Sequence, residues 1–313
     1  MATKKISDSG LKGWTTDELP DLSGKKILIT GGNSGIGLCA AKDLAKAGAD
    51  VIITSRTRAK AEAAVSEINT VAKGRANFVL LDLADLSNVR ECAFGIQERH
   101  PRLDALVCNA GICGTPHTLS PDGYELQFAT NHLGHFLLSA GLLSCIEASA
   151  GRIVVVSSYT HKGATLDLDD LMMEQSYSPL VAYARSKQAN LMFMMELDRR
   201  LKEAGSTASA VGCHPGYAAT NLQATGPQGL VFPRVLKYMT SLLAQKAEFG
   251  AIPISLAAAG KEALPGGYYG PQQYFENRGR IGDALISDKA LDTNMNRELW
   301  EKSEKLVGQA WSL

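Results

Sequence analysis

The sequence has no excess of charge of either sign and no long apolar run. Lys and Arg together number 32 of the 313 residues, and Asp and Glu also number 32, so the formal charge is zero. Without a basic field, nucleic acid and anionic lipid are poor partners. No stretch reaches about 18 consecutive apolar residues, and the start "MATKKISDSGLKGWTTDELPDLSG" has no signal-peptide core. We therefore expect a cytoplasmic protein with no membrane span and no nucleic-acid partner.

Cysteine is also sparse, with six residues and no Cys-x-x-Cys pair. Cys108 and Cys113 could form a disulfide or hold a metal, but no second group of ligands accompanies them. His132 and His135 lie close together without a third ligand at the spacing of a zinc site, so packing roles are expected for both. The composition therefore predicts a reducing compartment and no metal centre.

Short apolar runs alternate with amphipathic stretches along most of the chain. Strands without polar alternation, separated by helices, are typical of a parallel sheet covered on both faces. The sequence therefore predicts an α/β protein with a single doubly wound Rossmann-type domain and a mainly parallel sheet of six to seven strands. Six strands are expected at 25–30, 50–55, 76–82, 103–111, 152–158 and 207–216, a seventh at 266–270, and helices at 36–47, 59–71, 86–99, 124–147, 182–204 and 296–308.

No linker or repeat divides the chain, so residues 1–23 are predicted to be an N-terminal extension and 24–313 one domain. Two segments interrupt the regular alternation, near 159–181 and 221–248. The second carries five large apolar residues and is expected to form a lid over an apolar substrate, with a packed surface helix as the alternative. These five residues are Leu230, Val231, Phe232, Leu236 and Met239.

Glycines join the first expected strand to the first helix in "ILITGGNSGIG". Gly31, Gly35 and Gly37 permit a tight turn, close packing and close approach of the backbone to a pyrophosphate. The free N–H groups and positive dipole end of the following helix favour an anion there. The alternative is a purely structural turn.

The end of the second strand indicates which nucleotide would bind. Dinucleotide-binding domains that prefer NAD place an acidic residue there, on the ribose 2′-hydroxyl. This chain has Ser55 at that place and Arg56 next to it, and Arg56 can form charge-assisted bonds with a 2′-phosphate. Arg58 and Lys60 add positive charge nearby, or belong to a solvated basic loop. NADP(H) is predicted over NAD(H).

Tyr183 and Lys187 are four residues apart within an expected helix, so their side chains share a face. A phenol with a pKa near 10 is a poor acid or base at neutral pH, and an ammonium beside it favours the phenolate. The pair therefore predicts a catalytic acid/base. The alternative is a tyrosine at the core edge and a lysine extending into solvent.

Six motifs occur in the order found in one large family. They are "TGGNSGIG" (30–37), "CNAG" (108–111), "NHLGHF" (131–136), "VVVSS" (154–158), "YARSK" (183–187) and "HPGYAAT" (214–220). The chain resembles the short-chain dehydrogenase/reductase family over nearly its whole length, and within it the retinol dehydrogenase-like and carbonyl reductase branch.

The resemblance implies roles for individual residues. Tyr183 is the expected catalytic acid/base, Lys187 lowers its pKa and binds the nicotinamide ribose, and Ser158 polarises the substrate carbonyl, with Ser157 as its rival. Asn131 holds a water molecule in a proton relay. The cofactor contacts implied are Gly31, Asn33, Ser34, Gly35, Ile36, Gly37, Arg56, Asp82, Leu83, Asn109, Ala110, Gly111, Tyr183, Lys187, Pro215, Gly216 and Thr220.

Together these features predict an NADP(H)-dependent oxidoreductase that interconverts an apolar ketone or aldehyde and its alcohol. A non-catalytic NADP-binding redox sensor is one alternative. A sugar-nucleotide epimerase or dehydratase, which shares the Tyr-x-x-x-Lys pattern, is the other. The resemblance further implies a homodimer through helices 124–147 and 182–204.

Overall fold

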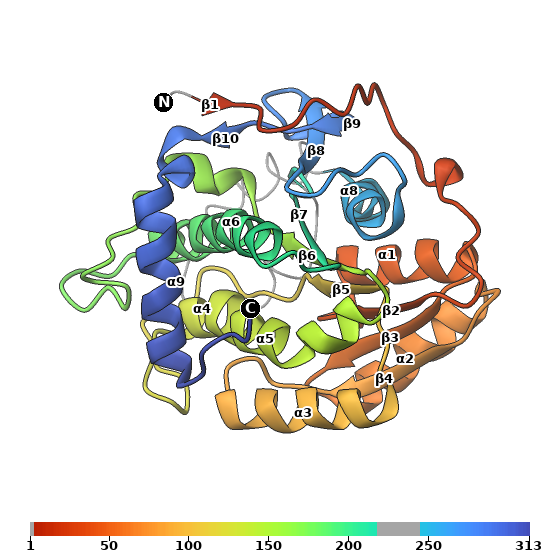
Figure 1. Cartoon of the computed structure of the whole chain (residues 1–313), viewed down its shortest axis with the longest axis horizontal. Coiled ribbons are helices and arrows are strands. Elements are labelled where there is room, and N and C mark those ends of the chain that lie inside the picture. The colour runs from red at the N-terminus through yellow and green to blue at the C-terminus, as the bar shows by residue number, and fades with distance from the viewer. Residues whose placement is uncertain (1–2, 218–244) are drawn as a thin grey trace, which may run out of the picture.

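The central sheet has eight strands, and its fold is the predicted Rossmann-type α/β arrangement (Figure 1). The computed structural model describes residues 3–217 and 245–313. The strands follow the order β4-β3-β2-β5-β6-β7-β8-β9, and only β9 runs antiparallel to its neighbour. Their bounds are Lys26–Ile29 (β2), Asp50–Ser55 (β3), Ala76–Leu80 (β4), Ala105–Cys108 (β5), Arg152–Val156 (β6), Ser209–Cys213 (β7), Tyr268–Gln273 (β8) and Arg278–Asp283 (β9).

The predicted count of six to seven strands was therefore too low. The seventh strand, β8, lies where it was expected, but β9 was missed because its sequence "RGRIGD" is polar and glycine-rich. Such a strand carries a weak hydrophobic signal. It forms by hairpin pairing with β8 at the edge of the sheet.

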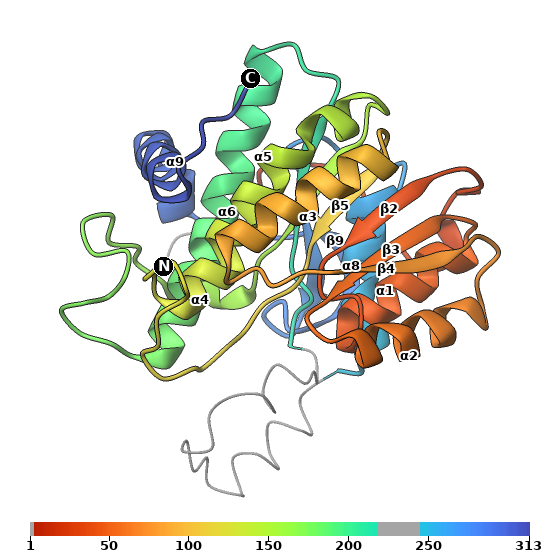
Figure 2. The same cartoon turned by 90° about the horizontal axis from the view of Figure 1, so that it is seen from below.

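Helices cover both faces of the sheet in two layers (Figure 2). One layer packs α1 (Gly35–Lys46), α2 (Arg58–Asn69) and α8 (Ala247–Ala259) on the sheet, and the other packs α3 (Leu86–Arg99), α5 (Gly134–Glu147) and α6 (Pro179–Glu203). The short helix α4 (Leu126–Phe128) and a π-helical turn (Ala129–Leu133) precede α5. The sequence missed α8, because it is apolar on every side and contains Pro253.

The N-terminal extension packs along the edge strand β9. Trp14 is buried, and its backbone N–H donates to the Ile281 carbonyl. Nearer the N-terminus, the Ser9 N–H and hydroxyl both donate to the Asp283 carboxylate. Strand β1 (Thr3–Lys4) pairs with β10 (Ile286–Ser287). The extension thereby covers an edge that would otherwise present unpaired backbone groups.

The C-terminal helix α9 (Thr293–Val307) lies against α6 (Figure 1). Trp300 is buried there, 5.0 Å from the Phe136 ring and 5.8 Å from the Phe193 ring, and Trp311 packs beside it. These contacts cover part of the α5–α6 surface through which a homodimer was expected. That dimer stays a prediction.

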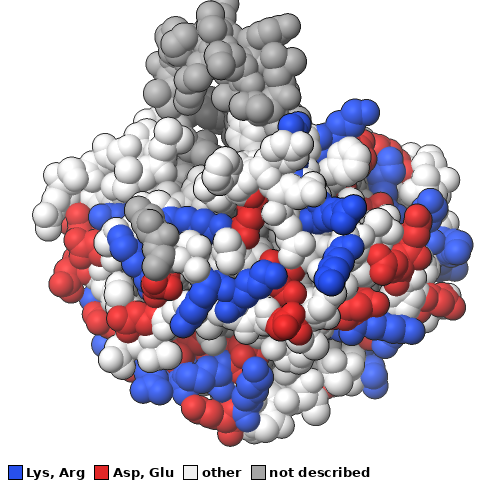
Figure 3. All heavy atoms as spheres, turned by 90° about the horizontal axis from the view of Figure 1, so that it is seen from above, with Lys and Arg blue, Asp and Glu red and all other residues white. Residues whose placement is uncertain are grey.

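Charges on the surface are mixed, in keeping with the zero formal charge. On the face shown in Figure 3, basic and acidic side chains are interspersed. Over residues 3–217 and 245–313, none of the helices combines the length and apolar character that crossing a membrane requires.

Candidate active site

The residues expected to carry the chemistry converge at the carboxyl ends of the parallel strands. Ser158 follows β6, and α6 brings Tyr183 and Lys187 alongside it. The Lys187 Nζ lies 5.9 Å from the centre of the Tyr183 ring and donates a 3.2 Å hydrogen bond to the Val156 carbonyl at the end of β6. Pro179 stands at the first position of α6, where a backbone N–H would have no partner within the helix, and it helps to set where this helix begins.

Burial governs the protonation of both α6 residues. Lys187 is only 3% exposed, and desolvation lowers its pKa to about 8. Desolvation also raises the pKa of Tyr183, and a hydrogen bond with Ser158 opposes that rise without cancelling it. That Lys187 lowers the pKa of this phenol stays a prediction from the resemblance. Its Nζ, 5.9 Å from the centre of the Tyr183 ring, lies within the range of about 4–6 Å over which an ammonium favours a phenolate.

The two candidate serines have different partners. Ser157 is buried, and its hydroxyl donates to the Lys187 carbonyl at 2.7 Å. Ser158 is partly exposed, accepts a 3.3 Å bond from the Thr160 N–H, and lies close enough to the Tyr183 phenol to oppose the rise in its pKa. The geometry thus favours Ser158 as the group available to a substrate and leaves Ser157 a structural tie between β6 and α6.

Asn131 lies in the π-helical turn before α5 and joins two parts of the site. Its Oδ1 accepts from the Ile112 N–H at 2.8 Å, and its Nδ2 donates to the Ile112 carbonyl and, at 2.9 Å, to the Ser186 hydroxyl. Ser186 in turn donates to the Tyr183 carbonyl. Sequence reasoning missed Ser186, although it stands inside the "YARSK" motif.

The two nearby histidines have separate structural roles, as expected. His132 contacts the Ser303 hydroxyl of α9 at 2.9 Å. His135 lies between the Asn131 carbonyl, at 3.0 Å, and the Thr30 hydroxyl, at 2.8 Å. Within the described part of the chain, no three His, Cys, Asp or Glu side chains gather as metal ligands.

The glycine turn forms a cradle beside α1. Gly31 and Gly35 have φ of +65° and +55°, a region that favours glycine. A Cβ on Gly37 would lie 2.5 Å from the Asn109 Nδ2. Ser34 precedes α1 without capping it through its side chain, so the first N–H groups of the helix stay available. Asn33 and Ile36 belong to this partly exposed turn.

Thr30 connects this turn to the end of β5, and sequence reasoning missed it. Its hydroxyl accepts from the N–H groups of Asn109 and Ala110 at 2.9 and 3.0 Å, and its carbonyl accepts from the Asn109 Nδ2. The Asn109 Oδ1 is buried without a partner among the described residues. An orphaned acceptor beside a glycine cradle fits a nucleotide that brings a donor.

Arg56 comes directly after β3, is exposed, and has no hydrogen-bond or ion-pair partner within 3–217 and 245–313. Arg58 is instead paired with Glu62 at 3.6 Å and stacks on Phe78. It is therefore engaged in the α2 surface, whereas Arg56 is free to reach a ligand.

The remaining predicted contacts have the following surroundings in the structure. The half-buried Asp82 accepts from the Ala84 N–H, and the Leu83 carbonyl lies where a Cβ on Gly134 would clash. Gly111 lies against Asn131 and Lys187. The Pro215 carbonyl accepts from Gln245, and Gly216 has φ of +68°. Thr220 and the five apolar residues of the expected lid lie outside the described residues.

Residues 25–229 match the family described as short chain dehydrogenase. The chain belongs to this family. It is therefore an oxidoreductase of the short-chain dehydrogenase type.

Among curated relatives, the chain is similar to retinol dehydrogenases. It is 37% identical to human retinol dehydrogenase 14 over 308 residues, which cover 92% of this chain and 87% of the relative. Human retinol dehydrogenase 13 is 38% identical, with 92% and 86% covered. These matches place the chain in the retinol dehydrogenase-like branch.

Solved structures share the fold. A crystal structure of an uncharacterised protein from Mycobacterium paratuberculosis has a TM-score of 0.80 at 37% identity, with 96% of this chain and 100% of that chain covered. A short chain dehydrogenase from Burkholderia cenocepacia in complex with NADP has a TM-score of 0.60 at 26% identity, with 79% and 96% covered.

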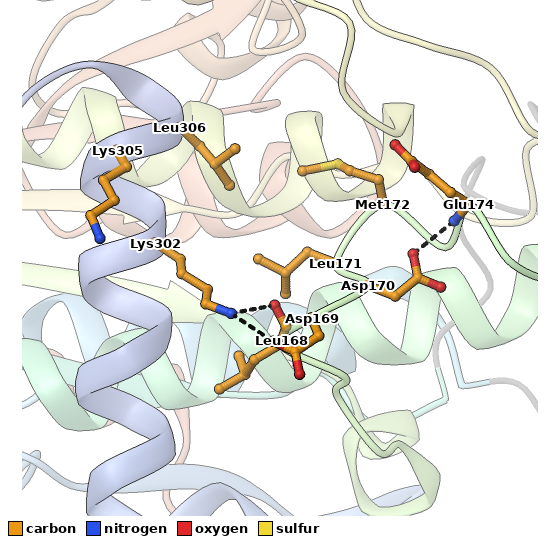
Figure 4. Close-up of a pocket in the computed structure, with 9 residues that line it drawn as sticks. All are labelled: Leu168, Asp169, Asp170, Leu171, Met172, Glu174, Lys302, Lys305 and Leu306. Carbon is orange, nitrogen blue, oxygen red and sulfur yellow. Dashed lines mark hydrogen bonds and ion pairs between the residues drawn. The ribbon is translucent and has the colours of Figure 1, made fainter.

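A shallow pocket of about 350 Å³ lies elsewhere, between the 159–181 segment and α9 (Figure 4). Leu168, Leu171 and Leu306 provide apolar surface, and Lys302 crosses one side to reach the Leu168 carbonyl and Asp169. Tyr183 and Ser158 do not line it. The pocket lies where the 159–181 segment packs against the C-terminal helix, and it is separate from the candidate active site.

Proposed function

We propose that this short-chain dehydrogenase is an NADP(H)-dependent enzyme that interconverts an apolar ketone or aldehyde and its alcohol. One observation carries the proposal. The Tyr183 phenol, the Ser158 hydroxyl and the Lys187 ammonium meet beside the glycine cradle, at the carboxyl edge of the sheet. This is the edge at which doubly wound proteins bind nucleotides.

Each protein group has a chemical task in carbonyl reduction. The hydride for the carbonyl carbon would come from NADPH bound at the glycine cradle. Ser158 donates a hydrogen bond to the carbonyl oxygen and stabilises the negative charge that develops on it. Tyr183 gives that oxygen its phenolic proton, so that an alcohol forms. The phenolate left on Tyr183 is stabilised by the Lys187 ammonium and is then reprotonated from solvent.

The protonation states of Tyr183 and Lys187 are compatible with carbonyl reduction. Because burial raises the pKa of Tyr183, the phenol keeps its proton at neutral pH and is ready to donate it. Lys187, with a pKa of about 8, is mostly an ammonium at pH 7. A protonated donor beside a cation is the arrangement that reduction requires.

Arg56 supports the preference for NADP(H). We expect Arg56→Gln to raise the KM for NADPH about 10- to 100-fold, since a charge-assisted bond to a phosphate contributes about 1.5–3 kcal/mol. The KM for NADH should change less than about twofold. Arg58→Gln is the matched control, because Arg58 is already paired with Glu62. Equal effects of Arg56→Gln on both nucleotides would contradict the assignment.

The substrate class can be tested with a panel of carbonyl compounds. Two relatives are named retinol dehydrogenases, so the panel should run from small polar sugars to bulky apolar aldehydes that include retinaldehyde. We expect NADPH oxidation to be fastest, by kcat/KM, with the bulky apolar members. Faster turnover of the small polar sugars would overturn the apolar assignment.

A complete lack of turnover despite tight NADPH binding would favour the redox-sensor alternative. Cytoplasmic location and the homodimer remain predictions from the sequence. Microscopy of a tagged chain and light scattering at several concentrations would test them.

A further inference from the structure

A buried ion pair joins two segments that border the active site. The Lys162 Nζ donates to the Glu276 Oε2 at 2.5 Å, and the two side chains are 12% and 7% exposed. Lys162 belongs to the 3-10 turn Tyr159–Gly163, which begins immediately after Ser158. Glu276 belongs to the turn between β8 and β9, so the pair spans 114 positions of sequence.

His214 completes the cluster from a third segment, the loop after β7. Its Nε2 lies 3.5 Å from the Glu276 Oε2, and its Nδ1 accepts from the Gly216 N–H. An accepting Nδ1 leaves the ring proton on Nε2. This nitrogen lies beside the carboxylate without a hydrogen-bond partner among the described residues. Burial lowers the pKa of His214, so the ring is neutral and Lys162 is the cation that balances Glu276.

The β8–β9 turn is held in an unfavourable backbone conformation. Tyr274, Phe275 and Glu276 have φ of 50°, 57° and 61° in succession. Residues with a Cβ avoid this left-handed region, and they remain there only where the surroundings impose it. The Phe275 side chain is 85% exposed whereas Glu276 is 5% exposed. Burial of the Phe275 ring therefore does not hold the turn. The Glu276 carboxylate anchors it from inside, because its Oε1 accepts from the Leu285 N–H at 2.8 Å and its Oε2 pairs with Lys162.

The turn contacts both sides of the site. On one side, the Lys162 turn includes His161, whose Nδ1 lies 2.6 Å from the Ser158 carbonyl. On the other side, the Asn277 carbonyl accepts from the Tyr217 N–H at 2.9 Å. A Cβ on Gly216 would lie 2.4 Å from that same carbonyl. A shift of the turn would therefore reach both the Ser158 hydroxyl and the Pro215–Gly216 loop.

We propose that Glu276 is a positioning residue, whose carboxylate, acting through Lys162 and His214, holds Ser158 and the Pro215–Gly216 loop in register with Tyr183. The role rests on the proposed function, because it is for hydride and proton transfer that this register matters. Small misplacements of reacting groups are costly to rate, about 100-fold for about 1 Å.

The decisive variant is Glu276→Gln, which keeps the shape of the side chain and removes its charge. We expect kcat to fall about 10- to 100-fold, while the KM for NADPH changes less than about twofold. Lys162→Arg, which can keep the ion pair, should retain kcat near that of the wild type. The Glu276→Gln/Lys162→Met double variant removes both charges together and should fold, yet its kcat should stay low.

Glu196→Gln is the matched control. Glu196 is a buried carboxylate paired with Arg199 and Arg200 towards the far end of α6. Removing the Glu196 charge should lower thermal stability while leaving kcat within about twofold of the wild-type value. A folded Glu276→Gln enzyme with the kcat of the wild type would overturn the positioning role.

Hydrogen exchange gives a readout that does not need turnover. In Glu276→Gln, amide exchange should accelerate in both 158–163 and 214–217, and Glu196→Gln should leave these segments unchanged. Acceleration confined to the β8–β9 turn would overturn the inference. If the wild type reduced no carbonyl compound, the proposed function would fail, and the exchange data would still decide whether Glu276 holds the two segments.

Discussion

Replacing Tyr183 by Phe should lower kcat for carbonyl reduction by about 10³-fold, within the range of about 10²–10⁴ that a positioned proton donor contributes. The ring would keep its place on α6, and only the phenolic oxygen would be lost. The phenolic hydroxyl next to Ser158 would be absent, so the alkoxide formed by hydride addition would lack its proton source. Steady-state NADPH oxidation with the best substrate of the panel measures the effect.

NADPH binding separates this loss from damage to the fold. The dissociation constant for NADPH, followed by fluorescence, should stay within a fewfold of the wild type. Tyr124→Phe makes the same chemical change at a hydroxyl that donates to the Leu306 carbonyl, next to α9, and it should retain kcat. Turnover by Tyr183→Phe at the rate of the wild type would show that another group supplies the proton.

Replacing Lys187 by Met should have opposite effects on activity and stability. We expect kcat/KM to fall by about 10²–10³, because the phenolate on Tyr183 would lose its stabilising cation, an electrostatic effect of about 3–4 kcal/mol in a buried site. At pH 7 the variant should nevertheless be more stable to unfolding by about 1–3 kcal/mol. A buried ammonium would be replaced by an apolar chain, and the Val156 carbonyl would keep the Asn190 Nδ2 as a donor.

The pH dependence of stability identifies the cause. The pKa of Lys187 falls from 10.5 in the unfolded chain to about 8 in the folded one. Between these values the unfolded state binds more protons, so the stability of the wild type should rise with pH from about 8 to about 10.5. The advantage of Lys187→Met should therefore shrink across this window.

Urea denaturation at pH 7, 8, 9 and 10 measures this difference in the free energy of unfolding. Lys202→Met is the control, because the Lys202 side chain is 61% exposed. The difference in free energy of unfolding between this variant and the wild type should not shrink as the pH rises. A Lys187→Met variant less stable than the wild type at pH 7 would mean that the ammonium is a net stabiliser of the fold.

Local features of the sequence were enough to predict the alternating architecture and the centre of the site. Strand β3 was predicted at the bounds that the structure shows. A short, mostly apolar run flanked by helical patterns favours a buried strand of a parallel sheet. Gly31 and Gly37 could be predicted because a strand-to-helix turn needs glycine at a few adjacent positions, either for a positive φ or for close packing. Tyr183 and Lys187 were recognisable because a helix converts a spacing of four into proximity.

What depends on distant partners could not be predicted in this way. Strand β9 is polar and pairs only because β8 is next to it, and α8 has no amphipathic pattern because its surroundings bury it on most sides. The choice of Ser158 over Ser157 came from the contact of Ser157 with the Lys187 carbonyl. The raised pKa of the Tyr183 phenol came from desolvation by the assembled site.

The Lys162–Glu276 pair shows the same division most clearly. Each residue reads in the sequence as an ordinary surface charge, in a turn with no motif. The fold buries most of both side chains and brings them together across 114 positions. The sequence by itself determined the family, and it predicted the nucleotide turn and the helix that carries the acid/base. The tertiary structure decided which groups are desolvated and which are paired, because the energy of a charge depends on its surroundings and not on its neighbours in the chain.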